Sequence, residues 1–165
     1  MIDLYFYFTA SIGVILFGIS KGGFAGPIAI LAIPIMALSM DPITAAAILL
    51  PILLIMDCIA LYFYWNKWNL KNFKIIIPPA IIGILIGSLT FQFSSPNKIR
   101  ILIGSICILF ILLTIFQKKN ILIKPSKTNG TFWSLITGYT SFIIHAGGQP
   151  ISFYLLPQKL NKTVY

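Results

Sequence analysis

Long apolar runs without a single charged residue constrain this chain more than any other feature. The stretches 75–97 and 101–117 contain no Lys, Arg, Asp or Glu. An average soluble domain has about 25% charged residues, whereas this chain of 165 residues has 9% charged and 58% hydrophobic residues. Because a fold in water needs charge to cover its surface, we predict an all-α, polytopic membrane protein, a helical bundle with its apolar helices in lipid.

The predicted spans follow from the length that a bilayer requires. About 20 apolar residues cross a hydrocarbon core of roughly 30 Å. The segments that meet this length are 44–65, 75–93 and 99–116. The region 4–38 is too long for one span, and it is interrupted between Lys21 and Pro27 by three glycines. Glycine weakens a helix and proline lacks a backbone donor, so we expect a broken or re-entrant helix there.

The charged residues indicate a membrane topology and exclude several partners. The net charge is +9, with 12 Lys and Arg against 3 Asp and Glu. Most basic residues lie between the apolar runs, as expected beside lipid headgroups and not on a nucleic-acid-binding face. Lysines are concentrated in 66–74 and 117–131, which predicts that both loops are cytoplasmic. Cys58 and Cys107 lie inside apolar runs, so we expect no disulfide framework, no metal site and no cofactor.

A sequence pattern occurs twice and predicts a partial internal repeat. Gly-x3-Phe-x-Ile-x2-Gly-Gly occupies 13–23 and recurs at 138–148. We therefore divide the chain into a first transmembrane repeat (1–117), a basic cytoplasmic loop (118–131) and the start of a second repeat (132–165). This second copy reads as truncated. If the first copy starts outside, the two copies are inverted, an arrangement common in secondary transporters with binding sites at broken helices.

Lys21 is the main candidate for a functional residue at the first break. It is the only basic residue in 1–66. A charge within the membrane costs several kcal/mol unless it is paired or faces water. The alternative is that Lys21 reaches the cytoplasmic surface as an anchor. Exposed glycine amides at the start of a helix bind anions without any side chain, so Ser20, Gly22 and Gly23 join Lys21 in a predicted anion site.

The second break carries the other half of this predicted site. The sequence here is His145-Ala-Gly-Gly-Gln-Pro, and His145 takes the place that Ser20 has in the first copy. If the two breaks face each other, His145, Gly147, Gly148 and Gln149 complete a polar, cationic cluster. The alternative for His145 is a buried histidine that donates one hydrogen bond to a carbonyl.

Asp57 and His145 are the candidates for proton coupling. Asp57 lies inside the span 44–65 and either relays protons or neutralises Lys21 in a static pair. Gly83 and Gly87 are spaced by four, which favours close helix packing. No phosphate-binding loop, nucleophile elbow or pair of catalytic carboxylates occurs. We therefore expect neither ATP-driven transport nor catalytic residues.

The sequence resembles the sulfite exporter TauE/SafE family, also called the toluene-sulfonate uptake permease group. The matching stretches are Gly-Ile-Ser-Lys-Gly-Gly-Phe at 18–24, Leu-Leu-Pro-Ile-Leu-Leu-Ile-Met-Asp at 49–57, the segment 138–148, and Tyr-Leu-Leu-Pro-Gln at 154–158. The resemblance implies a multi-pass permease of the bacterial inner membrane, built from two related halves, that moves sulfite, sulfonates or related organic anions.

Two further readings belong to other classes of protein. One is a non-transporting fragment or a membrane interaction subunit that lacks the second half. A homo-oligomer is compatible with this hypothesis and with a transporter. The other is an intramembrane enzyme that uses Cys58 beside Asp57. The preferred hypothesis is secondary transport of a small anion, with export favoured over import.

Overall fold

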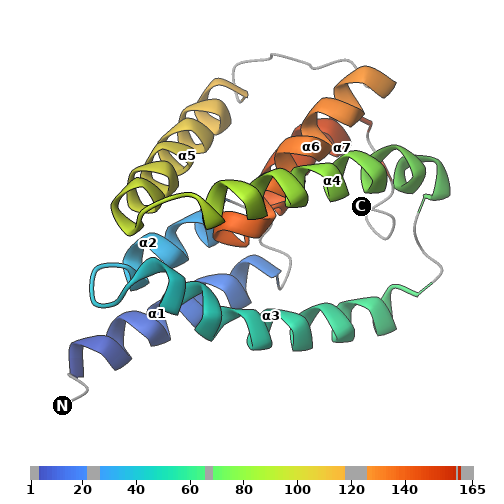
Figure 1. Ribbon diagram of the computed structural model, residues 1–165. Helices are drawn as coiled ribbons and strands as arrows, with labels where there is room; N and C mark the ends of the chain where they lie inside the picture. The colour runs from blue at the N-terminus through green and yellow to red at the C-terminus, as the bar shows by residue number, and fades with distance from the viewer. Residues whose placement is uncertain (1–3, 22–26, 66–68, 118–125, 159, 161–165) are drawn as a thin grey trace.

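The computed structural model describes residues 4–21, 27–65, 69–117, 126–158 and 160, and every regular element among them is helical (Figure 1). The elements are α1 (Leu4–Lys21), the 3-10 helix η1 (Pro27–Leu31), α2 (Ala32–Met36), α3 (Pro42–Phe63), α4 (Leu70–Gln92), α5 (Pro96–Gln117), α6 (Lys127–Ile144), α7 (Gly148–Leu155) and the 3-10 helix η2 (Leu156–Gln158). Among the described residues, α1, α3, α4 and the Pro96–Ile115 part of α5 are long and apolar enough to span a membrane. The predicted all-α membrane protein is confirmed.

The spanning helices begin earlier than their apolar runs because polar residues cap them. Asp41 accepts a hydrogen bond from the Ile43 amide, and Pro42 occupies the first turn of α3. The Asn69 side chain accepts from the amides of Lys71 and Asn72 and starts α4 at Leu70, five residues before the predicted span. Ser126 likewise caps α6 at 3.1 Å from the Asn129 amide. The division into repeats stays a prediction, although α6 starts inside the predicted loop.

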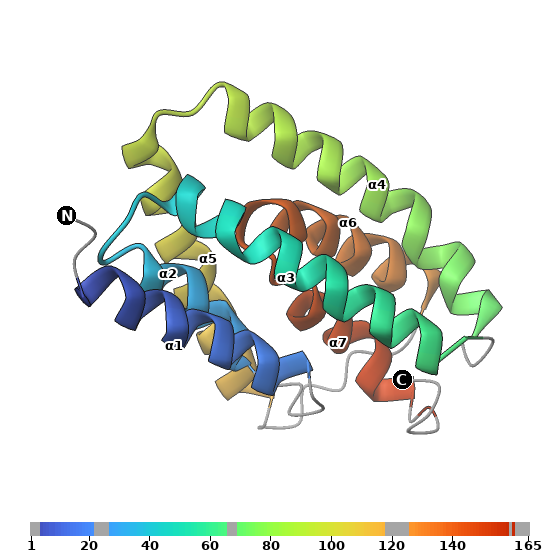
Figure 2. The ribbon, with the colours of Figure 1, turned by 90° about the horizontal axis from the view of Figure 1, so that it is seen from below.

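The first predicted break is present, and the chain turns back after it. α1 ends at Lys21, and the next described helix begins at Pro27. The hydroxyls of Thr9 and Ser39 form a hydrogen bond, and a methyl group on Gly13 would collide with Met36. η1 and α2 therefore run back alongside α1 as a re-entrant hairpin, as Figure 2 shows.

Glycines bring α4 and α6 together along most of their length. A methyl group on Gly83 would collide with the Leu135 carbonyl, and one on Gly138 with the Ala80 carbonyl. At Gly87 it would lie 3.2 Å from the Phe142 Cβ. The predicted packing role of Gly83 and Gly87 is confirmed. Ile75 near the start of α4 contacts Gly130 of α6, and Gly87 further along contacts Phe142, so the two helices run in the same direction.

A buried polar cluster fixes the far end of α7 to α4. The Asn72 amide group donates to the Gln158 side-chain oxygen at 2.8 Å, and the Tyr154 hydroxyl donates to Asn72 at 3.3 Å. Gln158 in turn donates to the Tyr154 carbonyl at 3.2 Å. Because Asn72 and Tyr154 are both buried, these bonds form in a dry setting where an unpaired polar group would be costly.

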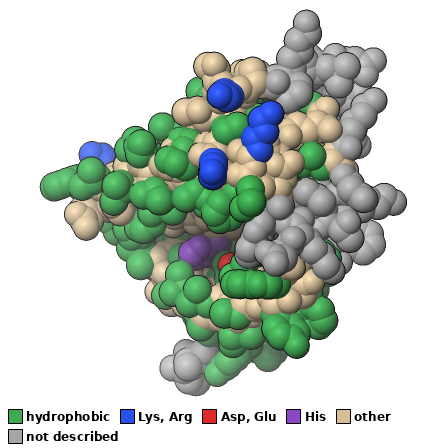
Figure 3. Space-filling view, turned by 90° about the vertical axis from the view of Figure 1, so that its right-hand side faces the viewer, with side chains coloured by type: hydrophobic (Ala, Val, Ile, Leu, Met, Phe, Trp, Pro, Cys, Tyr) green, Lys and Arg blue, Asp and Glu red, His purple; other side chains and the backbone are tan. Residues whose placement is uncertain are grey.

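The core lies where the two breaks meet α5. Phe17, Ile33, Phe110, Ile144 and Phe153 are buried there, and the rings of Phe110 and Phe153 stack with centroids 6.5 Å apart. Large apolar side chains cover much of the outer surface of the long helices, which is green in Figure 3. This arrangement suits lipid outside and a packed interior between the breaks.

Candidate functional site at the two helix breaks

The first break presents a lysine that is already paired. Lys21 is the last residue of α1, and its ammonium group forms an ion pair and hydrogen bond with the Asp57 carboxylate of α3. Pairing offsets the cost of holding either charge among apolar helices. The pairing of Lys21 with Asp57, one of the two alternatives that the sequence left open for Asp57, is therefore present.

The second break is formed by an unusual backbone conformation at His145. This residue ends α6 with φ 52° and ψ 23°, the left-handed region that favours glycine, and its amide donates to the Ser141 carbonyl at 3.1 Å. The ring Nε2 lies 3.2 Å from the Ala46 carbonyl of α3. Because a carbonyl can only accept, Nε2 carries the hydrogen. His145 therefore makes the hydrogen bond to a carbonyl that was one alternative, and it also lies at the break.

The short helix α7 starts directly after this turn and has no side-chain cap. It begins at Gly148, and its N-cap residue, Gly147, makes no side-chain hydrogen bond. The amides of a first helical turn have no partner within their own helix, so an uncapped start favours anions. Gly147 has a packing role of its own, since a methyl group there would lie 2.9 Å from the Ser141 Cβ.

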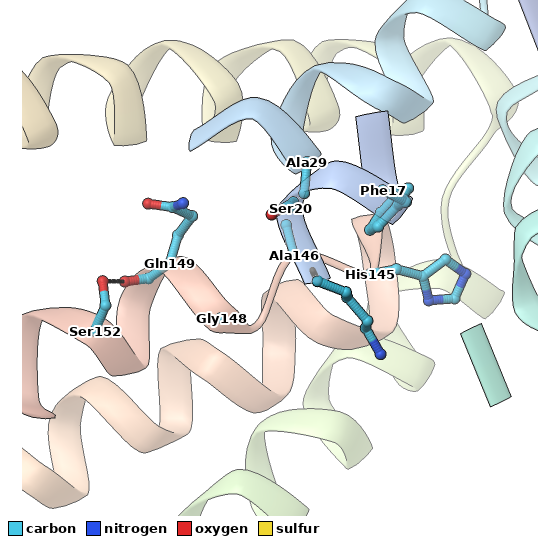
Figure 4. A pocket seen from close by; sticks show the side chains of 9 residues that line it. Phe17, Ser20, Ala29, His145, Ala146, Gly148, Gln149 and Ser152 are labelled. Atoms are coloured by element: carbon cyan, nitrogen blue, oxygen red, sulfur yellow. Dashed lines mark hydrogen bonds between the residues drawn. The ribbon is translucent and has the colours of Figure 1, made fainter. Parts of the chain in front are cut away.

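A cavity of about 160 Å³ lies between the two breaks. Five of the predicted site residues line it: Ser20, Lys21, His145, Gly148 and Gln149. Figure 4 shows Ser20 approaching from α1 on one side, with His145 and Gly148 on the other. Gly147 packs against α6 behind the cavity, and the predicted Gly22 and Gly23 lie outside the described residues.

Four lining residues were not predicted from the sequence: Phe17, Ala29, Ala146 and Ser152. Ser152 is the polar one, and its hydroxyl donates to the Gln149 carbonyl at 2.6 Å (Figure 4). Helical spacing could have revealed it, because residues three and four apart share one face of a helix. Ser152 therefore lies on the same face of α7 as Gly148 and Gln149.

Two residues of the site contact the spanning helix α3. His145 contacts α3 at Ala46, and Lys21 contacts it at Asp57. These positions are about 17 Å apart along the axis, at 1.5 Å per residue, and they lie on either side of the helix centre. Figure 3 looks into a hollow in which the purple histidine and a red acidic side chain are both visible.

A second, apolar cavity of about 380 Å³ adjoins the first at His145. It lies between α3 on one side and α4 and α6 on the other, with Ala46 and Leu50 facing Ile84 and Phe142. The imidazole therefore borders both cavities, and it contacts α3 at the Ala46 carbonyl.

Neither a metal site nor a reactive cysteine stands out in the described part of the chain. No group of three His, Cys, Asp or Glu side chains occurs there that could hold a metal ion. Cys107 is buried and its thiol donates to the Ile30 carbonyl at 3.5 Å, while Cys58 is exposed on α3. The polar groups at the cavity are a lysine, hydroxyls, an amide and a helix start, which suit an anion with several oxygen atoms.

Fold and site together define a multi-pass membrane protein whose broken helices meet around a small cavity that includes a lysine and other polar side chains in its lining, as in secondary transporters. The sequence model of the family described as sulfite exporter TauE/SafE matches residues 11–165. The chain belongs to this family, which comprises membrane transporters and not enzymes. No curated protein and no solved structure matches the chain.

Proposed function

We propose that this chain binds a small sulfur oxyanion, sulfite or a sulfonate, in the cavity between its two breaks and carries it out across the bacterial inner membrane. One observation carries the proposal: residues from both breaks, separated by more than a hundred positions in sequence, line one cavity. Binding between two broken helices near the membrane centre is the arrangement used by many secondary transporters.

The chemistry of the lining favours an anion over a cation. Lys21 supplies a positive charge, and the uncapped start of α7 adds the partial positive charge of a helix N-terminus. Ser20 and the Gln149 side chain offer hydrogen-bond donors to further oxygens. The cavity volume of about 160 Å³ also suits a small ion, since about 10 to 15 Å³ of such volume holds one water molecule.

The choice of sulfur oxyanions and of export rests on the family. The matching family is described as one of sulfite exporters, and the site contains the donors that such an ion needs. The direction of transport is measured with two vesicle preparations in which the protein is inserted in opposite orientations, so that the labelled anion meets one face of the protein at a time. If the protein exports the anion, transport that starts from the cytoplasmic face should be the faster of the two under the same gradient.

Replacing Lys21 tests the proposed site directly. We expect Lys21→Ala to lower sulfite and methanesulfonate flux into proteoliposomes by about tenfold to a hundredfold, because charge-assisted hydrogen bonds contribute about 1.5 to 3 kcal/mol. Lys21→Ala leaves Asp57 without its partner, so the double variant Lys21→Ala/Asp57→Asn is the matched control for folding. This double variant removes both charges and should insert normally while still failing to transport. Normal flux in either variant would contradict the role of Lys21.

A further inference from the structure

We infer that Asp57 competes with the transported anion for Lys21, so that each monovalent anion bound is accompanied by one proton taken up on Asp57. The inference rests on the proposed anion site and names what regulates it. It also decides between the two roles that the sequence left open for this carboxylate.

Lys21 lies between two possible partners for its charge, the Asp57 carboxylate and an anion in the cavity. Its ammonium group contacts Asp57, and Lys21 also lines the cavity. Asp57 is not among the residues that line the cavity. A lysine carries a compact charge on a flexible stem of four carbons. Small rotations of that stem therefore suffice to exchange a carboxylate partner for an anion in the cavity.

The balance of charge then requires a proton. In the empty site, Lys21 and Asp57 sum to zero. A monovalent anion would leave the site with one excess negative charge, which is unfavourable between apolar helices in a membrane. If Asp57 takes a proton from the solution on the side from which the anion enters, the loaded site is again neutral. The Lys21–Asp57 contact is broken, and a contact between Lys21 and the anion replaces it.

The charged and titratable groups near Asp57 indicate that Asp57 itself takes the proton. Among the described parts of the helices packed against α3, α1 faces it with Lys21, and α2 contributes no titratable side chain. The first turns of α5 carry Lys98 and Arg100, and Arg100 pairs with Asp41 at 3.9 Å near the opposite end of α3. His145 reaches α3 at Ala46, where its Nε2–H is already donated. A proton added to His145 would balance the anion as well, but it would leave Lys21 paired with Asp57 and so would not free Lys21 for the anion.

The direction of the pH dependence follows from this exchange. Lower pH favours the protonated carboxyl, frees Lys21 and strengthens anion binding. Once Asp57 is ionised in the anion-free protein, one linked proton lowers the anion affinity by about tenfold for each further pH unit. With Asp57→Asn, Lys21 is free at every pH, so the affinity no longer depends on this proton.

Titration calorimetry of the full chain in detergent tests the inference. Methanesulfonate is the probe because its sulfonate stays ionised, and two buffers with different ionisation enthalpies give the number of protons bound. We expect about one proton per anion for the unaltered protein and none for Asp57→Asn, with the variant binding more tightly at high pH. Asp41→Asn is the matched control, since asparagine also caps helices, and it should retain the proton.

The outcomes separate this inference from the proposed function. Anion binding without proton uptake, or proton uptake that persists in Asp57→Asn, would overturn the inference and leave the anion site standing. Absence of both methanesulfonate and sulfite binding in the unaltered protein would overturn the proposed function and the inference with it. If sulfite alone binds, the proton count is taken as the difference between the two proteins. A difference of one supports the inference, and a difference of zero overturns it.

Discussion

The two helix breaks face one cavity but differ in how they are built. At the first break, α1 ends in a charged residue, Lys21, which forms an ion pair with the Asp57 carboxylate. The second break carries no formal charge at the cavity, and it is fixed by packing: α6 is pressed against α4 at Gly138, and α7 is tied to α4 through Asn72 and Tyr154. The first break therefore supplies the charge and the second supplies a rigid wall.

Mutations at the two breaks should therefore have different consequences. Changes at the first break should alter binding and proton uptake with little effect on the fold, because the Lys21–Asp57 pair is partly exposed. Changes behind the second break should alter stability first, because their side chains and backbone are buried and closely packed.

The largest effect on stability is expected at the contact between α4 and α6. Gly138→Ala places a methyl group against the Ala80 backbone, which cannot move aside as a flexible side chain would. We expect a loss of about 3 kcal/mol or more of folding free energy, measured as thermal unfolding in detergent. Gly104→Ala on α5 is the control, because nothing lies within 4 Å of the added carbon. Equal stability of the two variants would show that the second break is not held by this packing.

A smaller effect is expected from the backbone of His145. Its φ of 52° is strained for a β-branched residue, so His145→Val should lower the free energy of unfolding by about 2 kcal/mol. In His145→Gly the lost bond to Ala46 is offset by the relief of strain, and stability should stay within about 1 kcal/mol of the unaltered protein. Thermal unfolding of both variants in the same detergent measures the difference. A glycine variant as unstable as the valine variant would show that the side-chain bond, and not the backbone conformation, holds the turn.

The smallest effect is expected at the polar cluster behind α7. Tyr154→Phe removes the hydroxyl that donates to Asn72 at 3.3 Å and keeps the ring that packs beside Gly130. We expect a loss of about 1 kcal/mol, seen as earlier unfolding in denaturant. Proton uptake on anion binding should be unchanged, since the cluster lies outside the cavity. A loss of proton uptake in this variant would contradict the separation between the charged break and the rigid wall.

The sequence predicted which segments form the site, but not all of the contacts within it. The repeated Gly-Gly pairs identified both breaks, because glycine inside an apolar run weakens a helix wherever it occurs. That Ser20 and Gln149 line one cavity depended on the assumption that the breaks face each other, which the structure bears out geometrically. Their role in binding stays a prediction.

Other features could not be predicted because they depend on contacts between distant segments. Hydropathy alone does not mark α6 as a span, and its place follows from its glycines fitting against α4. The pairing of Lys21 with Asp57 was one of two options until α1 and α3 were seen side by side. The early start of α4 depends on the cap at Asn69, which the apolar run does not reveal.

The central claim is that one anion is bound between both breaks, and ligand protection of cysteines tests it most directly. Single cysteines at Ser20 and at Ser152, in a protein with Cys58→Ser, are labelled with N-ethylmaleimide in the presence and absence of methanesulfonate. Thr131→Cys, at an exposed position near the start of α6, is the control. The account predicts that the anion slows labelling at both Ser20→Cys and Ser152→Cys and leaves the control unchanged. Protection at only one break, or at neither, would contradict it.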